Sequence, residues 1–314
     1  VEGTVGLVYA VGAITGGDSG FDPVFGRTLG ARSTIEMLEN VARDDALDAV
    51  VIRVDSPGGD ALASEEIWAA IEEVKKHHPV IVSMGDVAGS GGYYIAAGAE
   101  TIVAAPSTIT GSIGVLGVIF NAAETWDKLG IRWDTVTTNP AAEFPTTIRP
   151  MTEAERGTFR DLIADIYRSF LERVAAGRGR SIPEIDAVAQ GRIWSGTQAS
   201  ERGLVDEVGG LETALVAARR AAGLDPEARV ALHIYPAEQT LMERLRELAM
   251  LQGVRSSPSR AAAGVRLAGG ARISEPAAVA MVRELAALVT GFGAALRDAP
   301  GRPLTVMPFV PTIR

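Results

Sequence analysis

Residues 80–94, VIVSMGDVAGSGGYY, combine an apolar run, a glycine-rich turn and the start of a helical pattern. The run at 80–84 is typical of a buried strand, and Ser90 follows it on the turn between Gly89 and Gly91. A serine on a sharp strand-to-helix turn is exposed, and the backbone N–H groups after it point in the same direction. This is the geometry that a nucleophile and an oxyanion hole require.

Apolar runs and helical patterns alternate on both sides of this stretch. Continuous apolar strands suit a parallel sheet covered on both faces, and their alternation with helices predicts βαβ units and an α/β fold. One helix is predicted to begin at Ser64 as its N-cap, and a long helix after Thr152 is predicted to turn Leu162 and Phe170 inward. The predicted strands are 6–14, 49–54, 80–84, 101–105 and 115–120, and the other predicted helices are 31–43, 181–188 and 211–222. Residues 16–30 and 106–114 are predicted to be loops.

The chain changes character after residue 224. We predict an α/β core over residues 1–224 and a mainly helical extension over 225–314. Helical patterns in the extension occupy 240–251 and 276–296, and a short edge strand is predicted at 303–310.

Composition excludes several classes of function. The net charge of -9 and the pI near 5.0 argue against a nucleic-acid partner. The absence of cysteine excludes disulfides, thiolate metal sites and a cysteine nucleophile. The sequence has no apolar run of the roughly 18 residues that a membrane span needs. Because it begins at Val1 rather than at a methionine, we expect it to be trimmed from a longer protein.

A second glycine turn supports the interpretation of Ser90 as a nucleophile. On its own, a Gly-Ser-Gly-Gly sequence is more often a plain tight turn. Here Gly58 and Gly59 close the preceding strand, and turns that follow parallel strands lie at the same edge of a sheet. The N–H groups of Gly59 and Gly91 are therefore predicted to converge on one oxygen.

The sequence offers this serine no evident general base. His77 and His78, together with Lys75 and Lys76, end a helix and are predicted to lie at the opposite edge of the sheet. His233 is predicted on a strand surface. Lys128 is predicted in the last turn of a short helix, and no lysine follows it. We therefore expect neither a Ser-His-Asp triad nor a metal site.

Four motifs in order resemble the signal peptide peptidase A family over about residues 5–222. They are SPGG at 56–59, GSGGYY at 89–94, PSTITGSIG at 106–114, and GRIWSG at 191–196 followed by GLVD at 203–206. The resemblance implies a ClpP/crotonase-like fold and a serine peptidase with a Ser/Lys dyad. The resemblance assigns Ser90 as the nucleophile and Gly59 and Gly91 as the oxyanion hole. Ser112 matches the family serine that forms a hydrogen bond with the catalytic lysine.

The chain departs from the family pattern at the lysine. Short family members carry it roughly fifty residues after the serine, and residues 137–145 here contain none. Long members carry two copies of the fold, with the serine in the second copy and the lysine in the first. The chain resembles that second copy, so we expect an upstream N-terminal copy or a neighbouring subunit to supply the lysine.

The resemblance also implies substrates, partners and location. The substrates would be peptides, including remnant signal peptides, and no metal or organic cofactor is required. The chain would form homo-oligomers and associate with a membrane through a segment outside this sequence, on the outer face of the cytoplasmic membrane.

Two other functions remain open from the sequence. One is a pseudoenzyme that keeps the fold as a scaffold or peptide-binding module without a complete dyad. The other is a crotonase-type acyl-CoA enzyme, which shares the paired backbone donors. The sequence has no basic cluster for CoA phosphates beside the Gly58 or Ser90 turns, so this function ranks below the peptidase.

Overall fold

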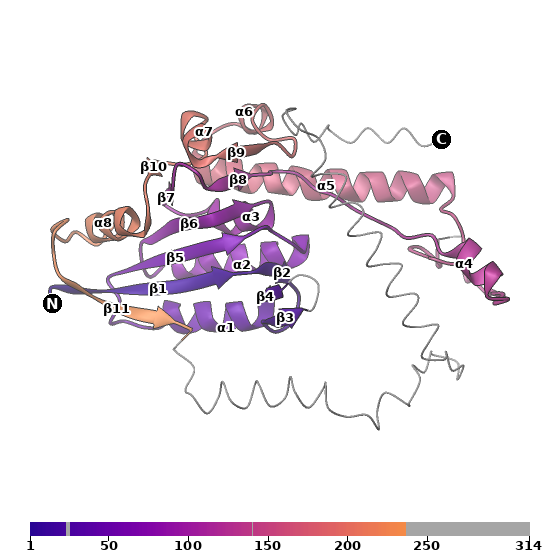
Figure 1. The fold of residues 1–314 in the computed structure, drawn as a ribbon, viewed down its shortest axis with the longest axis horizontal. Helices are drawn as coiled ribbons and strands as arrows, with labels where there is room; N and C mark the ends of the chain where they lie inside the picture. The colour runs from indigo at the N-terminus through magenta and orange to yellow at the C-terminus, as the bar shows by residue number, and fades with distance from the viewer. Residues whose placement is uncertain (23–25, 140, 237–314) are drawn as a thin grey trace, which may run out of the picture. The chain divides into compact units, whose positions relative to one another are not determined.

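A parallel sheet forms the centre of the structure, a computed structural model that describes residues 1–22, 26–139 and 141–236 (Figure 1). Its strand order is β10-β7-β6-β5-β1-β11, and β8 and β9 extend it beside the end of β6. The strands are β1 (Gly3–Val11), β5 (Ala49–Ser56), β6 (Val80–Gly89), β7 (Thr101–Ala104), β8 (Ile109–Gly111), β9 (Ile193–Ser195), β10 (Glu207–Val208) and β11 (Val230–Tyr235). Every neighbouring pair in the main order is parallel, which confirms the predicted α/β class.

Helices cover both faces of this sheet, as the continuous apolar strands predict. On β5, Val50, Ile52 and Val54 pack with one group of helices, whereas Val51 faces α8 on the other side. The first group is α1 (Ala31–Ala42), α2 (Ala61–Val74), α3 (Gly91–Ala96) and α5 (Glu153–Arg178), and the opposite helix is α8 (Leu211–Ala221). The α6 (Ile182–Asp186) and α7 (Gly196–Glu201) helices flank β9 along the chain.

Three predicted details near the sheet edge are wrong. Residues 106–114, predicted as a loop, contain β8. Residues 16–30, predicted as a loop, contain β3 (Gly20–Asp22) and β4 (Gly26–Gly30), which form a small sheet with β2 (Ala13–Thr15). The N-cap of α2 is Asp60 rather than Ser64, because the Asp60 carboxylate accepts a hydrogen bond from the Ala63 N–H. The helix therefore begins directly after Gly59.

Residues 115–139, called the arm below, also differ from the prediction. The structure assigns no strand to 115–120 and forms α4 (Ala123–Lys128) further along the arm. A methyl group on Gly117 would lie 2.5 Å from Phe159 and 2.7 Å from Ile163 of α5, so one side of the segment rests on that helix. Leu116, Val118 and Phe120 are 79%, 62% and 65% exposed. The apolar run is thus met by packing against a helix, with no strand partner among the described residues.

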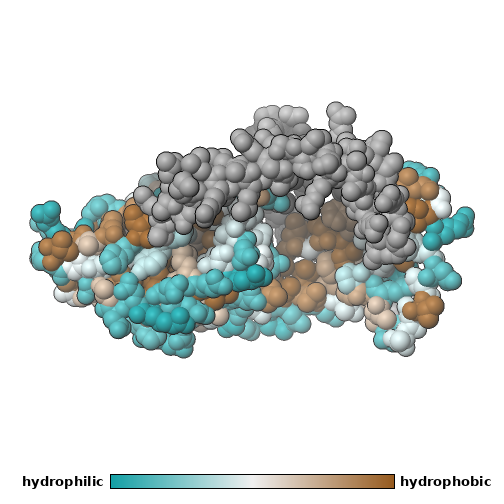
Figure 2. Space-filling model, turned by 90° about the horizontal axis from the view of Figure 1, so that it is seen from below, coloured by the Kyte–Doolittle hydropathy of each residue, from teal (hydrophilic) through white to brown (hydrophobic). Residues whose placement is uncertain are grey.

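The α5 helix extends past the sheet, which explains a further difference. Its 26 residues span about 39 Å, and its buried aromatic Phe170 lies in the second half. Leu162, predicted to face inward, is 50% exposed. Hydrophobic residues are also visible at the α4 end of the molecule in Figure 2. The exposed hydrophobic residues of the arm include Leu129, Trp133 and Val136.

The last described strand joins the core sheet. β11 pairs in parallel with β1, from Gly3 opposite Val230 to Val8 opposite Tyr235. The boundary after residue 224 stays a prediction, because the helical patterns at 240–251 and 276–296 and the edge strand at 303–310 lie outside the described residues. Among the helices that the structure describes, none has the length and hydropathy of a membrane span.

An ion-pair cluster fastens the chain after the arm to the start of α5. Both Arg149 Nη atoms lie 2.8 Å from the Glu155 carboxylate oxygens, and Arg149 Nε lies 3.0 Å from Glu143. Glu155 also completes a capping box with Thr152. The Arg149 guanidinium, assisted by the Thr152 N–H, lowers the pKa of Glu155 to about 2.

Stability should therefore depend on pH through Glu155. The folded pKa lies below the usual 4.5, so the pair contributes stability above that pH and loses it as pH falls toward 2. Glu155→Gln should lower the thermal midpoint at neutral pH, and its difference from wild type should close over this acidic range. Thermal unfolding of both proteins across pH, with exposed Glu153→Gln as the control, measures this. An unchanged gap at low pH would contradict it.

Candidate active site

Ser90 occupies the junction between β6 and α3, as the sequence predicts. Its backbone angles are φ 52° and ψ -120°, which a non-glycine residue rarely adopts. The Ser90 N–H donates to the Gly111 carbonyl at 3.0 Å, and its own carbonyl accepts the Tyr94 N–H at 2.9 Å. The hydroxyl does not cap the helix. A strained residue with an uncommitted hydroxyl is a feature often found at functional sites.

The Gly58–Gly59 turn lies directly against the Ser90 turn. A methyl group on Gly58 would lie 2.6 Å from the Gly91 nitrogen and 2.8 Å from Ser90 Cβ. The φ of Gly58 is 98°, so both its conformation and its surroundings require glycine. The contact fixes the two turns at a separation that a side chain would not allow.

The two predicted donors lie close together. A methyl group on Gly91 would lie 3.2 Å from the Gly59 nitrogen. Around Gly59, the Gly58 carbonyl accepts from Ile14 and the Asp60 N–H donates to Ile14, both at 2.9 Å. Neither the Gly59 N–H nor the Gly91 N–H has an acceptor among the described residues. The pair is therefore available to an oxygen that is not part of the described chain.

Ser112 lies beside Ser90. The β6–β8 register ends with Gly89 opposite Gly111, so the two serines follow paired residues. A methyl group on Gly89 would lie 3.6 Å from Ser112 Cβ. The Ser112 N–H donates to the Arg192 carbonyl at 2.7 Å, and its φ is 50°. The structure thus brings together all four predicted site residues.

The lysines and His233, all within the described residues, belong to other elements. α2 starts beside Gly59 and runs for 14 residues, which places Lys75 and Lys76 about 20 Å away. Lys75 pairs there with Glu72 at 2.9 Å. Lys128 is exposed in the last turn of α4, and His233 lies on the surface of β11. No described group of histidines and carboxylates could hold a metal ion.

Sequence reasoning missed two residues that shape the Gly58–Gly59 turn. The Ser56 hydroxyl accepts the Gly58 N–H at 3.1 Å, and a methyl group on Gly92 would lie 2.6 Å from the Ser56 carbonyl. Ile14 bonds to both sides of Gly59 through its backbone. The position of Ser56 in the SPGG motif could have indicated its hydrogen bond with the Gly58 N–H. No local pattern marks Ile14, which lies 45 residues before Gly59.

Two tyrosines anchor the helix that follows Ser90. The Tyr93 hydroxyl donates to the Leu204 carbonyl at 2.8 Å, and burial raises the Tyr93 pKa far above its usual value. The Tyr94 hydroxyl donates a hydrogen bond to the Glu65 carboxylate, which also accepts one from Arg173 Nη2 at 2.6 Å. Burial opposes ionisation of Glu65, but the hydrogen bonds from Arg173 and Tyr94 outweigh it and lower its pKa. These contacts hold α3 against α2 and α5.

Comparisons with known proteins agree with the motifs. The model of the family described as Peptidase family S49 matches residues 72–225, which include Ser90 and Ser112. The chloroplastic serine protease SPPA of Arabidopsis thaliana is 39% identical over 208 residues, covering 66% of this chain and 31% of that protein. Protease 4 of Salmonella typhi is 38% identical over 223 residues, covering 71% and 35%. The chain therefore spans about a third of the length of these two relatives.

A relative of closer size matches over most of its length. The Synechocystis sp. protein slr0021 is 34% identical over 216 residues, which cover 69% of this chain and 78% of that protein. Among solved structures, a mutant of the 1510-N membrane-bound stomatin-specific protease matches with a TM-score of 0.48 and 16% identity, covering 76% of this chain and 100% of that one. On the sequence matches, the chain belongs to peptidase family S49, the signal peptide peptidase A family.

Proposed function

We propose that this chain carries the nucleophile half of a serine endopeptidase site. The observation that supports the proposal most is the contact between the two glycine turns, with the Gly59 and Gly91 N–H groups free beside Ser90. Ser90 Oγ attacks the peptide carbonyl carbon, and the electron pair of the carbonyl moves to its oxygen. The two amides bind that oxyanion, an interaction that accelerates such reactions by about 10²–10³-fold per donor.

A lysine from an upstream copy or a neighbouring subunit completes the site in this proposal. Its neutral amine accepts the Ser90 proton and returns it to the leaving amine as the C–N bond breaks. Water then hydrolyses the acyl-serine ester. Ser112, beside Ser90, orients the lysine by accepting a hydrogen bond from it. No step uses a metal or an organic cofactor.

The fold and assembly follow from family membership as further proposals. The core has the ClpP/crotonase-like arrangement of βαβ units, and the substrates are peptides such as remnant signal peptides. The chain forms homo-oligomers at the outer face of the cytoplasmic membrane, held there by a segment outside this sequence. The exposed Leu116, Val118 and Phe120 of the arm favour an interface with another copy.

A pseudoenzyme is the second candidate. The observation that favours it is the position of the lysines: Lys75 and Lys76 follow α2, about 20 Å from its start beside Gly59, and Lys128 is exposed on α4. Such a protein would bind peptides beside the glycine turns without forming an acyl-serine intermediate.

Covalent labelling tests the peptidase proposal against this rival. A serine hydroxyl displaces fluoride from a peptidyl fluorophosphonate and forms a P–O bond, and oxyanion donors hold the phosphoryl oxygen of the reagent during this step. We expect labelling at Ser90, mapped by mass spectrometry, and none in Ser90→Ala. Ser107→Ala, in the loop before β8, serves as the control and should still be labelled. Reaction spread over other serines, or none at Ser90 even with an added amine base, would refute the proposal.

A further inference from the structure

The strand that carries Ser90 is bent before it reaches the site. β6 pairs with β7 through residues 81–83 and with β8 through residues 87–89. Against β5, Val54 lies opposite Met84, but Ser56 lies opposite Ala88. Between these two pairs β5 advances by two residues and β6 by four. The extra residues form a β-bulge in β6 at Gly85, Asp86 and Val87. Bulges redirect the strand after them and are common next to active sites.

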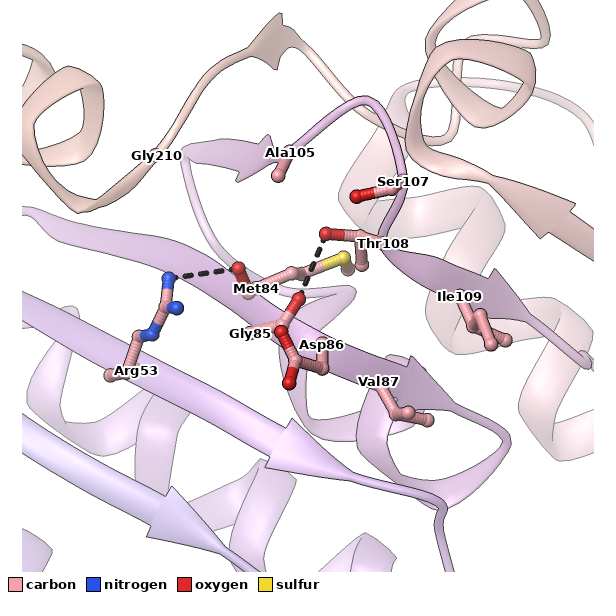
Figure 3. Close-up of a pocket in the computed structure, with 10 residues that line it drawn as sticks. All are labelled: Arg53, Met84, Gly85, Asp86, Val87, Ala105, Ser107, Thr108, Ile109 and Gly210. Atoms are coloured by element: carbon pink, nitrogen blue, oxygen red, sulfur yellow. Dashed lines mark hydrogen bonds between the residues drawn. The ribbon is translucent and has the colours of Figure 1, made fainter.

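Side chains hold the backbone of this bulge. Arg53 Nη1 donates to the Met84 carbonyl at 2.9 Å, and the Asp55 carboxylate accepts the Val87 N–H at 3.1 Å. The Thr108 hydroxyl donates to the Gly85 carbonyl at 2.8 Å. Figure 3 shows Arg53 and Thr108 reaching the bulge from opposite sides, around a cavity of about 290 Å³. These groups satisfy backbone atoms that a bulge removes from the regular ladder.

The end of β6 sets the position of Ser90. After the bulge, Gly89 pairs with Gly111 and Ser90 meets Gly58 in a contact with no spare room. If the bulge relaxed, the extra residues would shift Ser90 along the strand or turn it to the other face, since a one-residue slip reverses every side chain.

We propose that Thr108, assisted by Arg53 and Asp55, is a positioning residue for Ser90. These side chains hold the β6 bulge and thereby keep the Ser90 hydroxyl in line with the Gly59 and Gly91 amides. The inference rests on the proposed function, but it concerns residues outside the nucleophile and its donors.

Thr108→Val tests the inference, because valine keeps the size of threonine and removes the hydrogen bond. Thr108→Ser retains the hydroxyl and should restore function. The matched control is Thr34→Val in α1, since Thr34 is also buried and its hydroxyl donates to the Gly30 carbonyl at 2.7 Å. The primary readout is the affinity of the full chain for a peptidyl boronic acid, which forms a tetrahedral adduct with a serine hydroxyl.

We expect Thr108→Val to weaken the boronic acid adduct about ten- to a hundredfold, as a small misplacement of a reacting group does. Thr34→Val and Thr108→Ser should bind like the wild-type chain. Amide hydrogen exchange over residues 85–92 should speed up in Thr108→Val and not in Thr34→Val.

Equal affinity in Thr108→Val and Thr34→Val would overturn the inference and leave the proposed function standing. Absence of an adduct in the wild-type chain, or an adduct that persists in Ser90→Ala, would overturn the proposed function itself. Hydrogen exchange would then still decide whether Thr108 holds the bulge.

Discussion

The isolated chain should hydrolyse a peptide about 10³-fold more slowly than the whole Protease 4 of Salmonella typhi does. A positioned general base contributes about 10²–10⁴-fold to such reactions, and the chain's lysines lie at the ends of α2 and α4, not on the elements that carry Ser90. Parallel rates of hydrolysis for one fluorogenic peptide measure the difference. Ser90→Ala of the chain gives the background rate.

An external base should recover part of this loss. A small alkylamine such as ethylamine can reach Ser90, which is only partly buried, and accept its proton. The rate should rise with pH as the neutral amine form increases, and Ser90→Ala should not respond. Hydrolysis by the isolated chain that matches Protease 4 and depends on Ser90 would show that the base lies within these residues.

Gly58→Ala should weaken the boronic acid adduct by about 10²-fold, the effect of losing one oxyanion donor. The added methyl group would lie 2.6 Å from the Gly91 nitrogen and 2.8 Å from Ser90 Cβ. Either the Gly58 turn or the Ser90 turn must move, and the two N–H groups then no longer face one oxygen. Adduct affinity and the thermal midpoint are measured together.

Gly223→Ala separates this effect from simple backbone strain. Gly223 has φ 73°, and a methyl group added to it would have no neighbouring atom within 4 Å, so alanine there introduces strain without a contact. Alanine in the left-handed region costs about 1–2 kcal/mol of stability. Gly223→Ala should therefore lower the midpoint while the adduct keeps its affinity. A Gly58→Ala chain that binds the boronic acid as tightly as Gly223→Ala would contradict the proposed donor geometry.

The sequence predicted those parts of the site that local patterns encode. Apolar runs located the strands, and glycine spacing located the Ser90 turn, because each depends on neighbours a few residues apart. The contact of Gly58 with Ser90 followed from the rule that parallel strands end at the same edge. These inferences needed no knowledge of distant contacts.

Other features depend on residues far apart in the chain. The apolar run at 115–120 fits both a strand and an extended segment packed on a helix, and only the position of Phe159 and Ile163 distinguishes them. The bulge in β6 depends on Asp55 and Thr108, which lie on different elements. Leu162 faces outward because α5 is longer than the sheet that it covers. None of these has a local signature.

The backbone conformation of Ser90 lowers the stability of the fold in order to hold this side chain in place. Its φ and ψ are those of the first central residue of a type II′ turn, where glycine is preferred. Holding a serine there costs about 1–3 kcal/mol. Folding alone would favour glycine at this position, and the role proposed for the hydroxyl accounts for the serine.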